Sequence, residues 1–364
     1  MGNDGPTVGA VIATYNSSRV VVEAIDSLLS QEPRPSQVVV VDDGSTDDTP
    51  AVLERYRSRL ESIRQSNLGP SAARNTGWAR LTTDAVLFLD ADDVLLPGGL
   101  AARRTLLADG QAPWAYTEGL LQDSAGSRWP FSRSFSPKRG RGRGWIFQDL
   151  LCRNFITTSA LIVRRELLQI TGGFDVSICG VEDWDLALRL AVRYPVRYGV
   201  EPTFVQRLSP NSLSQNRCAM DRMRCLTLAK IQQLYPQEVL AAGVAARRSV
   251  ADAHNWFGYG LAEAGRWGEA RPILWTSVRL WPAQGRAWWL LMRCLTNAHR
   301  PGGPLGSTPR RQDSAAGAVE EGTPHRQRSP PRIRRMLRFS SHLRATASAN
   351  CGFLSLNAKA RRAE

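Results

Sequence analysis

Short apolar runs and amphipathic segments alternate along the first hundred residues. The runs at 8–13, 37–41 and 85–89 are apolar without alternation, as in strands that a sheet buries on both faces. The sequence predicts helices between them, and a small edge strand near 63–65. The apolar face of the first helix comprises Val20, Val21, Ala24, Ile25, Leu28 and Leu29, and further helices are expected over 50–60, 71–80 and 100–108. Strand and helix in alternation predict an α/β fold with a doubly wound, mostly parallel sheet.

Strands and helices are also expected in the middle of the chain, except in one stretch. A stretch rich in Ser, Arg and Gly at 123–144 predicts a mobile loop, and it contains a basic cluster at 138–143. The expected strands are 115–121, 155–163, 196–200 and 203–208, and the expected helices are 165–170 and 186–192.

Beyond Pro210 the pattern indicates helices alone. Residues 220–234 are amphipathic, and 251–284 resemble one tetratricopeptide-type hairpin, although an ordinary hairpin that extends an enzyme domain is an equal alternative. A further helix is expected over 285–295. We therefore expect three parts: an α/β domain over 1–210, a helical extension over 211–298, and a disordered basic tail over 299–364.

Charge is concentrated at the end of the chain. The formal net charge of the 364 residues is +14, and residues 301–364 hold 12 Lys and Arg against 4 Asp and Glu. This balance favours anionic partners, and contact of the tail with an anionic membrane is one hypothesis. Aromatic-interleaved basic motifs and zinc-finger spacings are absent, so no specific nucleic-acid binding is expected.

The cysteines and the absence of long apolar runs bear on location. Six cysteines occur without a C-x-x-C pair, which fits a reduced chain. Neither a signal peptide nor an apolar run of about 18 residues is visible. We expect a cytoplasmic protein, with a peripheral position at the inner face of the membrane as a further hypothesis.

Three carboxylates end the apolar run at 85–89. Asp90 and Asp92, one residue apart, could both reach a divalent cation that bridges a diphosphate, with Asp93 adjacent. The carboxyl end of a central strand is also where open α/β sheets bind ligands. A solvated turn after the strand is the alternative for these acids taken alone.

Five motifs in register carry a resemblance to a known family. They are Val11-Ile12-Ala13-Thr14-Tyr15-Asn16, the segment from Val40 to Thr49 with Asp42-Asp43-Gly44-Ser45, Gly69-Pro70-Ser71-Ala72-Ala73-Arg74-Asn75, Asp90-Ala91-Asp92-Asp93, and Glu182-Asp183. In this order and spacing they resemble family 2 glycosyltransferases with the GT-A fold, over about residues 6–210.

The resemblance implies a site for a nucleotide-diphosphate sugar, with a UDP-sugar favoured. The binding residues that it implies are Thr14, Tyr15, Asn16, Asp42, Asp43, Arg74, Asp90 and Ala91, and the implied ligands of Mn²⁺ or Mg²⁺ are Asp90 and Asp92. Tyr15 would stack near the base, Asp42 would accept hydrogen bonds from base or ribose, and Arg74 would approach the diphosphate. The alternatives are a core tyrosine, an Asx-turn and a solvated helix arginine.

The resemblance also implies the catalytic base. Asp183 would take the proton from an acceptor hydroxyl during a single, inverting displacement, and Glu182 is the neighbour that could exchange roles with it. Capping of the helix that begins there is the alternative. The Gln-x-x-Arg-Trp signature of processive synthases is absent after Asp183, which favours transfer of a single sugar.

These expectations define two hypotheses. The first is a metal-dependent glycosyltransferase that acts on a hydroxyl acceptor, whether glycan, lipid-linked or protein, in polysaccharide, glycolipid or cell-envelope glycan synthesis. The second is an inactive GT-A domain that works as a scaffold through its helical hairpin and basic tail. The intact Asp90, Asp92 and Asp183 favour the first.

Overall fold

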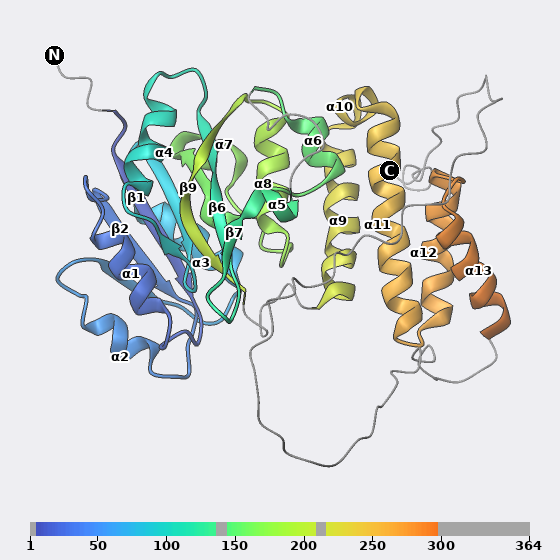
Figure 1. Ribbon diagram of the computed structural model, residues 1–364, viewed down its shortest axis with the longest axis horizontal. Coiled ribbons are helices and arrows are strands. Elements are labelled where there is room, and N and C mark those ends of the chain that lie inside the picture. Colours follow the sequence, from blue (N-terminus) through green and yellow to red (C-terminus); the bar gives the residue numbers. More distant parts are fainter. Residues whose placement is uncertain (1–4, 136–143, 209–215, 298–364) are drawn as a thin grey trace, which may run out of the picture. The chain divides into compact units, whose positions relative to one another are not determined.

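A nine-stranded sheet forms the centre of the computed structural model, which describes residues 5–135, 144–208 and 216–297 (Figure 1). Its order is β3-β2-β1-β4-β8-β6-β9-β5, with β7 paired to β6. The strands are β1 (Val8–Thr14), β2 (Gln37–Asp42), β3 (Glu61–Arg64), β4 (Ala85–Asp90), β5 (Val94–Leu95), β6 (Trp114–Gln122), β7 (Arg128–Pro130), β8 (Leu161–Arg164) and β9 (Val196–Arg207). The predicted α/β class is confirmed.

The first four strands in the order form the parallel half of the sheet. β2, β1 and β4 pair in parallel, as do β2 and β3. Because helices cover these strands, Val38 to Val41 and Ala85 to Leu89 are buried on both faces, as their unbroken apolar runs predict. β8 then joins β4 in the antiparallel direction.

Eight helices and one 3₁₀ turn accompany the sheet. They are α1 (Val21–Leu29), α2 (Thr49–Glu54), α3 (Pro70–Arg80), α4 (Gly99–Ala108), α5 (Phe131–Phe135), α6 (Phe147–Cys152), η1 (Thr158–Ala160), α7 (Arg165–Thr171) and α8 (Glu182–Ala191). α3 begins with Pro70, a residue suited to the first helical position because its missing N–H has no partner there in any helix.

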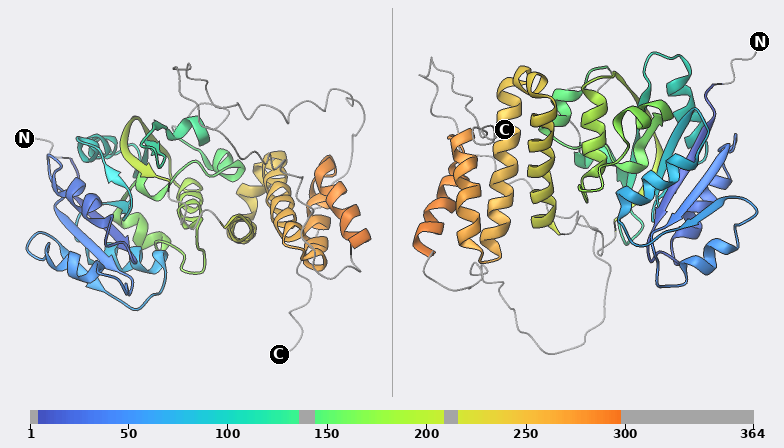
Figure 2. Two further views of the ribbon diagram at one scale, coloured as in Figure 1. Left: turned by 60° about the horizontal axis from the view of Figure 1, so that its bottom comes forward. Right: turned by 180° about the vertical axis from the view of Figure 1, so that it is seen from behind.

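The helical extension follows β9. It comprises α9 (Arg217–Leu234), α10 (Pro236–Ala241), α11 (Gly243–Glu263), α12 (Trp267–Leu280) and α13 (Gly285–Asn297). The long helices α9, α11, α12 and α13 lie side by side in both views of Figure 2. Helices thus occupy the predicted hairpin, whereas its membership of the tetratricopeptide class and the domain boundary near residue 210 stay predictions.

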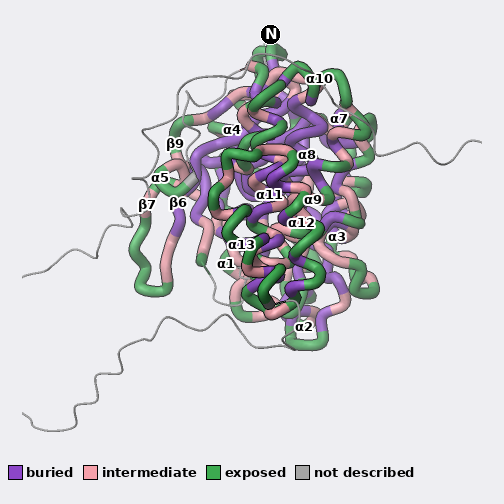
Figure 3. Tube along the Cα trace, turned by 90° about the vertical axis from the view of Figure 1, so that its right-hand side faces the viewer, coloured by how far each residue is buried: buried purple, intermediate pink, exposed green. Residues whose placement is uncertain are grey.

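The extension shares its core with the sheet domain. Leu228 and Ile231 of α9 and Ala253 of α11 belong to one buried apolar cluster with the strands and with α8. A second, smaller cluster lies between α11, α12 and α13. One cluster of buried positions therefore includes residues of both the sheet domain and the extension, and Figure 3 colours buried positions purple in both.

Four predicted elements differ from the structure. The helix expected over 50–60 ends at Glu54, because residues 55–59 are mostly exposed and Tyr56 alone among them packs against the core. The strand expected over 155–163 begins only at Leu161, since a 3₁₀ turn precedes it. The strands expected over 196–200 and 203–208 are one strand, β9, whose pairing with β6 shifts register near Pro202. The loop expected over 123–144 contains β7 and α5.

Two expectations fall outside the described residues. These are the basic cluster at 138–143 and the disordered tail over 299–364. Among the residues that are described, no helix combines the length and the apolar character needed to cross a membrane.

Candidate active site

The carboxyl ends of three parallel strands bring the predicted residues to one edge of the sheet. The register pairs Thr14 of β1 with Asp42 of β2, and Ala13 of β1 with Asp90 of β4. Residues that are 28 and 77 positions apart along the sequence thus become neighbours in the sheet. This edge is the general place for ligands in open α/β sheets.

Asp42 and Asp43 have different surroundings. Asp43 accepts hydrogen bonds from Gln65 Nε2 (2.7 Å) and from the backbone N–H groups of Leu68 (2.9 Å) and Gly69 (2.8 Å), so it shapes the turn that leads into α3. Asp42 Oδ1 accepts from the Ser45 N–H (2.9 Å).

Two buried oxygen atoms at this edge have no hydrogen-bond partner among the residues that the structure describes. They are Oδ2 of Asp42 and Oγ1 of Thr14, which belong to residues paired across β1 and β2. The Arg64 guanidinium lies 3.4 Å from Asp42 Oδ2 without forming a hydrogen bond. Because buried polar atoms are normally satisfied, this pair could accept hydrogen bonds from a ligand that carries donors.

Tyr15 and Asn16 follow β1. The Tyr15 side chain is 47% exposed, which excludes the core tyrosine that the sequence left open. Asn16 adopts a left-handed backbone (φ 50°), and its Oδ1 accepts the N–H groups of Thr46 (2.8 Å) and Asp47 (3.3 Å). Asn16 thereby ties the end of β1 to the loop after β2, and the exposed ring of Tyr15 stands beside that junction.

The acids after β4 are held by a serine from another element. Ser159 Oγ donates to Asp93 Oδ2 (2.5 Å) and accepts the Asp90 N–H (3.0 Å). Asp93 and Ala91 are buried, whereas Asp90 and Asp92 are partly exposed. Burial, together with the charge of Asp90, raises the pKa of Asp92. Burial and the charges of Asp90 and Asp92 raise the pKa of Asp93 well above its ordinary value.

This arrangement fits a divalent cation that a ligand helps to bind. Within residues 5–135, 144–208 and 216–297, no group of three His, Cys, Asp or Glu side chains could hold a metal ion unaided. Mn²⁺ and Mg²⁺ at phosphate sites, however, need only one or two carboxylates, with phosphate oxygens and waters completing the shell. Asp90 and Asp92 offer such a pair, and their mutual repulsion, evident in the raised pKa of Asp92, would be relieved by a cation.

Arg74 joins the two acidic motifs. From α3, its Nη2 lies 2.7 Å from Asp90 Oδ1 and its Nη1 lies 2.8 Å from Glu182 Oε1. The side chain is buried, which excludes the solvated helix arginine left open by the sequence, and its guanidinium packs over the Phe174 ring at 5.3 Å. Burial lowers the pKa of Arg74, but the charges of Asp90 and Glu182 outweigh this and raise it.

Glu182 and Asp183, at the start of α8, are distinguished by their contacts. Glu182 is buried and ion-paired with Arg74. Asp183 is partly exposed, and its Oδ1 accepts the N–H of Trp184 (2.6 Å) and of Asn154 Nδ2 (3.1 Å). Burial and the charge of Glu182 raise the pKa of Asp183 to about 7. Asp183 therefore contributes to the helix start and is also the carboxylate suited to proton transfer near neutral pH.

The sequence did not identify two contributors to this site. Ser159, in the 3₁₀ turn before β8, connects Asp90 and Asp93, and Asn154, after α6, orients Asp183. Both are more than 25 positions from the acids they contact, so no local pattern marks them. The polar triplet at 157–159 inside an apolar run was the one visible signal.

Comparisons with known proteins show which family and fold this chain resembles. Residues 10–166 match the family described as Glycosyl transferase family 2. The succinoglycan biosynthesis protein ExoO of Rhizobium meliloti is 42% identical over 98 residues, which cover 26% of this chain and 28% of ExoO.

Solved structures extend the likeness to the fold. Staphylococcus aureus TarS 1–349 in complex with UDP has a TM-score of 0.54 at 19% identity, over 80% of this chain and 88% of that one. The mannosyltransferase PcManGT from Pyrobaculum calidifontis, in complex with GDP-Man and Mn²⁺, has a TM-score of 0.53 at 21% identity, over 81% of this chain and 86% of that one. At such identities the likeness concerns the fold.

Proposed function

We propose that this chain, whose residues 10–166 match the family described as Glycosyl transferase family 2 and whose fold is similar to that of solved glycosyltransferases, transfers a single sugar from a nucleotide-diphosphate sugar to a hydroxyl acceptor. The observation that carries the proposal is the Arg74 bridge. It joins Asp90, which would lie on the side of the diphosphate, to Glu182, whose neighbour Asp183 would lie on the side of the acceptor.

The donor would lie along the carboxyl edge of β1, β2 and β4. Thr14, Asp42 and Asp43 would meet the nucleoside, with Tyr15 and Asn16 beside it, and Ala91 and Asp90 would lie near the diphosphate. A UDP-sugar is favoured, although GDP-Man is bound by one structure of the same fold, so the test includes both bases. Asp90 and Asp92 would hold Mn²⁺ or Mg²⁺, which neutralises the charge that develops on the departing diphosphate.

Asp183 would act as the general base. Its carboxylate would take the proton of the acceptor hydroxyl while that oxygen forms a bond to the anomeric carbon and the diphosphate oxygen leaves from the opposite face. Such a single displacement inverts the anomeric centre. Asn154 would keep Asp183 oriented, and Arg74 would keep Asp90 and Glu182 in place without requiring direct contact with the donor. Glycan, lipid-linked and protein hydroxyls in polysaccharide or cell-envelope synthesis are the acceptor classes considered.

The test is hydrolysis of UDP-, GDP- and dTDP-sugars with Mn²⁺. We compare the wild type with Asp92→Asn and Asp183→Asn, and use Glu166→Gln as the matched control, because Glu166 is an exposed acid on α7. Turnover that disappears on chelation and in Asp92→Asn, but persists in Glu166→Gln, supports the proposal. Absence of both turnover and metal-dependent nucleotide binding would favour the scaffold hypothesis.

A further inference from the structure

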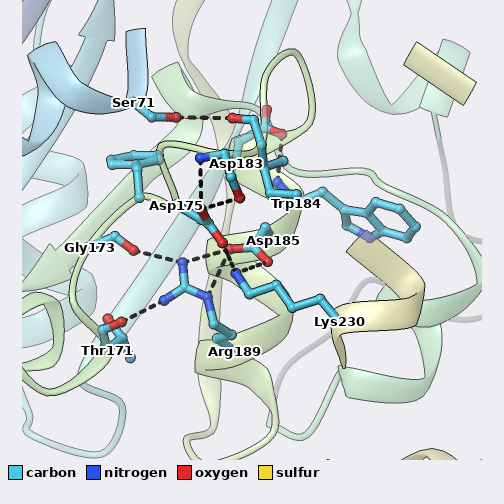
Figure 4. A network of polar contacts seen from close by, with 12 residues as sticks. Ser71, Thr171, Gly173, Asp175, Asp183, Trp184, Asp185, Arg189 and Lys230 are labelled. Atoms are coloured by element: carbon cyan, nitrogen blue, oxygen red, sulfur yellow. Dashed lines mark hydrogen bonds and ion pairs between the residues drawn. The ribbon is translucent and has the colours of Figure 1, made fainter. Parts of the chain in front are cut away.

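Lys230 of α9 makes an unusual contact with the sheet domain. Three of the 47 basic Lys and Arg residues are lysines, and Lys230 is the one that lies in the described part of the chain. Its Nζ lies 2.6 Å from Asp175 Oδ2 and 2.7 Å from Asp185 Oδ1 (Figure 4). A single amine of the helical extension thus bridges two carboxylates from different segments of the sheet domain.

The two carboxylates belong to the segments that support the proposed acceptor side. Asp185 is fully buried in the first turn of α8, two residues after Asp183. Arg189 binds the other Asp185 oxygen at 2.7 Å and also donates to the carbonyls of Thr171 (2.8 Å) and Gly173 (2.7 Å). The start of α8 is therefore fixed to the loop that precedes it.

Asp175 lies in that same loop, next to Phe174. The Phe174 ring packs under Arg74, and Asn75 exchanges hydrogen bonds with the Phe174 backbone at 2.7 and 2.9 Å. Lys230 therefore contacts both the first turn of α8, which contains Asp183, and the loop whose Phe174 packs against Arg74. An ammonium has three donors that can rotate toward two carboxylates arriving from different directions.

We propose that Lys230 is a positioning residue for the acceptor side of the site, so that the helical extension completes the catalytic geometry. This inference rests on the proposed glycosyl transfer. Since reaction rates fall steeply when catalytic groups move by about 1 Å, loss of the bridge should reduce turnover more than donor affinity.

The experiment compares Lys230→Met with Arg222→Met, which removes a charge from an exposed position on the same helix. We expect kcat to fall at least about 10-fold in Lys230→Met with the donor KM changed less than about 2-fold. Arg222→Met should match the wild type. Asp175→Asn leaves the ion pair between Lys230 and the buried Asp185 intact. It provides a variant that folds if Lys230→Met does not, and it should show a smaller loss of kcat.

A second readout separates this inference from the proposed function. Amide hydrogen exchange of residues 182–186 should be faster in Lys230→Met than in Arg222→Met, whether or not any donor is turned over. If the wild type shows no turnover but exchange is faster in Lys230→Met, the result would contradict the proposed glycosyl transfer and would still support the positioning role of Lys230. Unchanged exchange and unchanged kcat in folded Lys230→Met would overturn the positioning role.

A different observation concerns the end of the helical stack. Residues 270–297 contain four tryptophans and four arginines but no Asp, Glu or Lys. On α13 the residues Ala287, Leu290, Leu291 and Cys294 are buried against α11 and α12. Trp288, Trp289, Met292 and Leu295 are between 43% and 61% exposed, and Trp275 of α12, 49% exposed, meets Trp288 edge to face at 6.4 Å. We call these five residues the tryptophan face.

The chemistry of this face limits what could cover it. Arg271 and Arg279 of α12 are exposed, and the one acid of that helix, Glu269, already pairs with Arg266, so a second copy related by two-fold symmetry would bring like charges together. A bilayer interface with anionic headgroups suits the combination, because tryptophan and aliphatic side chains enter the headgroup boundary while Arg271 and Arg279 bind phosphates. We infer that the tryptophan face binds an anionic membrane surface.

Vesicle sedimentation of the full chain tests this inference. Wild type should pellet with vesicles of phosphatidylcholine and phosphatidylglycerol and much less with phosphatidylcholine alone. The double variant Trp289→Gln with Met292→Gln should bind at least about 5-fold more weakly, while Leu240→Gln, an equally exposed apolar position on α10, should bind normally.

Two results would overturn it. One is normal vesicle binding by the double variant, which would assign binding to another part of the chain such as the basic tail. The other is self-association of the wild type in light scattering that the double variant abolishes, which would make a second copy the occupant.

Discussion

At the scale of single residues, the two acids that begin α8 divide their tasks through their surroundings. Glu182 is committed to Arg74, whereas Asp183 keeps a carboxylate that is oriented but not ion-paired in any contact described. Burial and the neighbouring Glu182 charge raise the pKa of Asp183 to about 7. A carboxyl group whose pKa is raised toward neutrality is a recurring feature of acid–base sites.

The pH dependence of transfer should report Asp183. A general base must be ionised before it can accept a proton, so we expect kcat/KM for the acceptor to rise about 10-fold per pH unit below the pKa and to level off near pH 7. Glu166→Gln should keep this profile. A rate that is flat between pH 5 and pH 8 would exclude Asp183 as the group that titrates.

Stability should respond to the same group in the opposite direction. The pKa of Asp183 is higher in the folded protein than in the unfolded chain, so the folded protein keeps this proton to a higher pH. The contribution of Asp183 to the free energy of unfolding is therefore lost as the pH rises from about 4 to about 7. In urea denaturation without metal, Asp183→Asn should gain about 1–3 kcal/mol relative to wild type at pH 8 and little at pH 4. A difference that does not vary with pH would contradict the raised pKa.

How far the sequence predicts the site depends on where the contacts come from. The residues at the ends of β1, β2 and β4 could be predicted, because parallel strands place their carboxyl ends together. The Arg74 pairing with Asp90 and Glu182 could not, since it spans 108 positions and depends on how α3 and α8 pack. The roles assigned to individual site residues remain predictions.

At the scale of elements, close packing of α3 on β1 positions Arg74. Gly77 faces β1, and a Cβ there would lie 2.5 Å from Val11 Cγ1. A glycine in the middle of this helix is explained by contact, because a larger residue would push α3, and Arg74 with it, away from the sheet.

Gly77→Ala should therefore destabilise the protein by about 1–3 kcal/mol in urea denaturation and should lower activity. Gly268→Ala is the control: its Cβ would meet nothing within 4 Å, so a neutral effect or a gain of up to about 1 kcal/mol is expected. Equal effects of the two substitutions would argue against close contact between α3 and β1.

The elements that the sequence placed correctly share one property. Each has a continuous apolar run or a clear helical face, as in β2, β4 and α1. Two of the misplaced ones are decided by partners that are distant in the sequence. The 3₁₀ turn at Thr158–Ala160 directs Ser159 to the acids after β4, and the register shift within β9 is set by its pairing with β6.

At the scale of the whole molecule, the helical extension and the sheet domain depend on each other. Besides the Lys230 bridge, Ser249 of α11 donates to the Leu151 carbonyl of α6, and Trp184 of α8 packs against Arg224 of α9. The tryptophan face lies at the other end of the extension, on α12 and α13.

A chain that ends after Leu208 should fold poorly. It lacks buried Leu228 and Ile231, which at about 1.5–3 kcal/mol each represent a loss of about 5 kcal/mol before the ion pairs are counted. A chain that ends after Thr308, where the first compact unit ends, should keep the wild-type melting temperature within about 2 °C. A cooperative transition in the shorter chain near the wild-type temperature would show that the extension is dispensable.

The Lys230 bridge also has a consequence for biosynthesis. The proposed donor edge and Asp183 are synthesised well before α9. A nascent chain would therefore carry every proposed reactive group before it carries Lys230, the residue that pairs with Asp175 and Asp185. Competence for transfer would then arise only after about residue 253 has emerged, when α11 joins the core. The order of synthesis would keep an unfinished enzyme from acting on its donor.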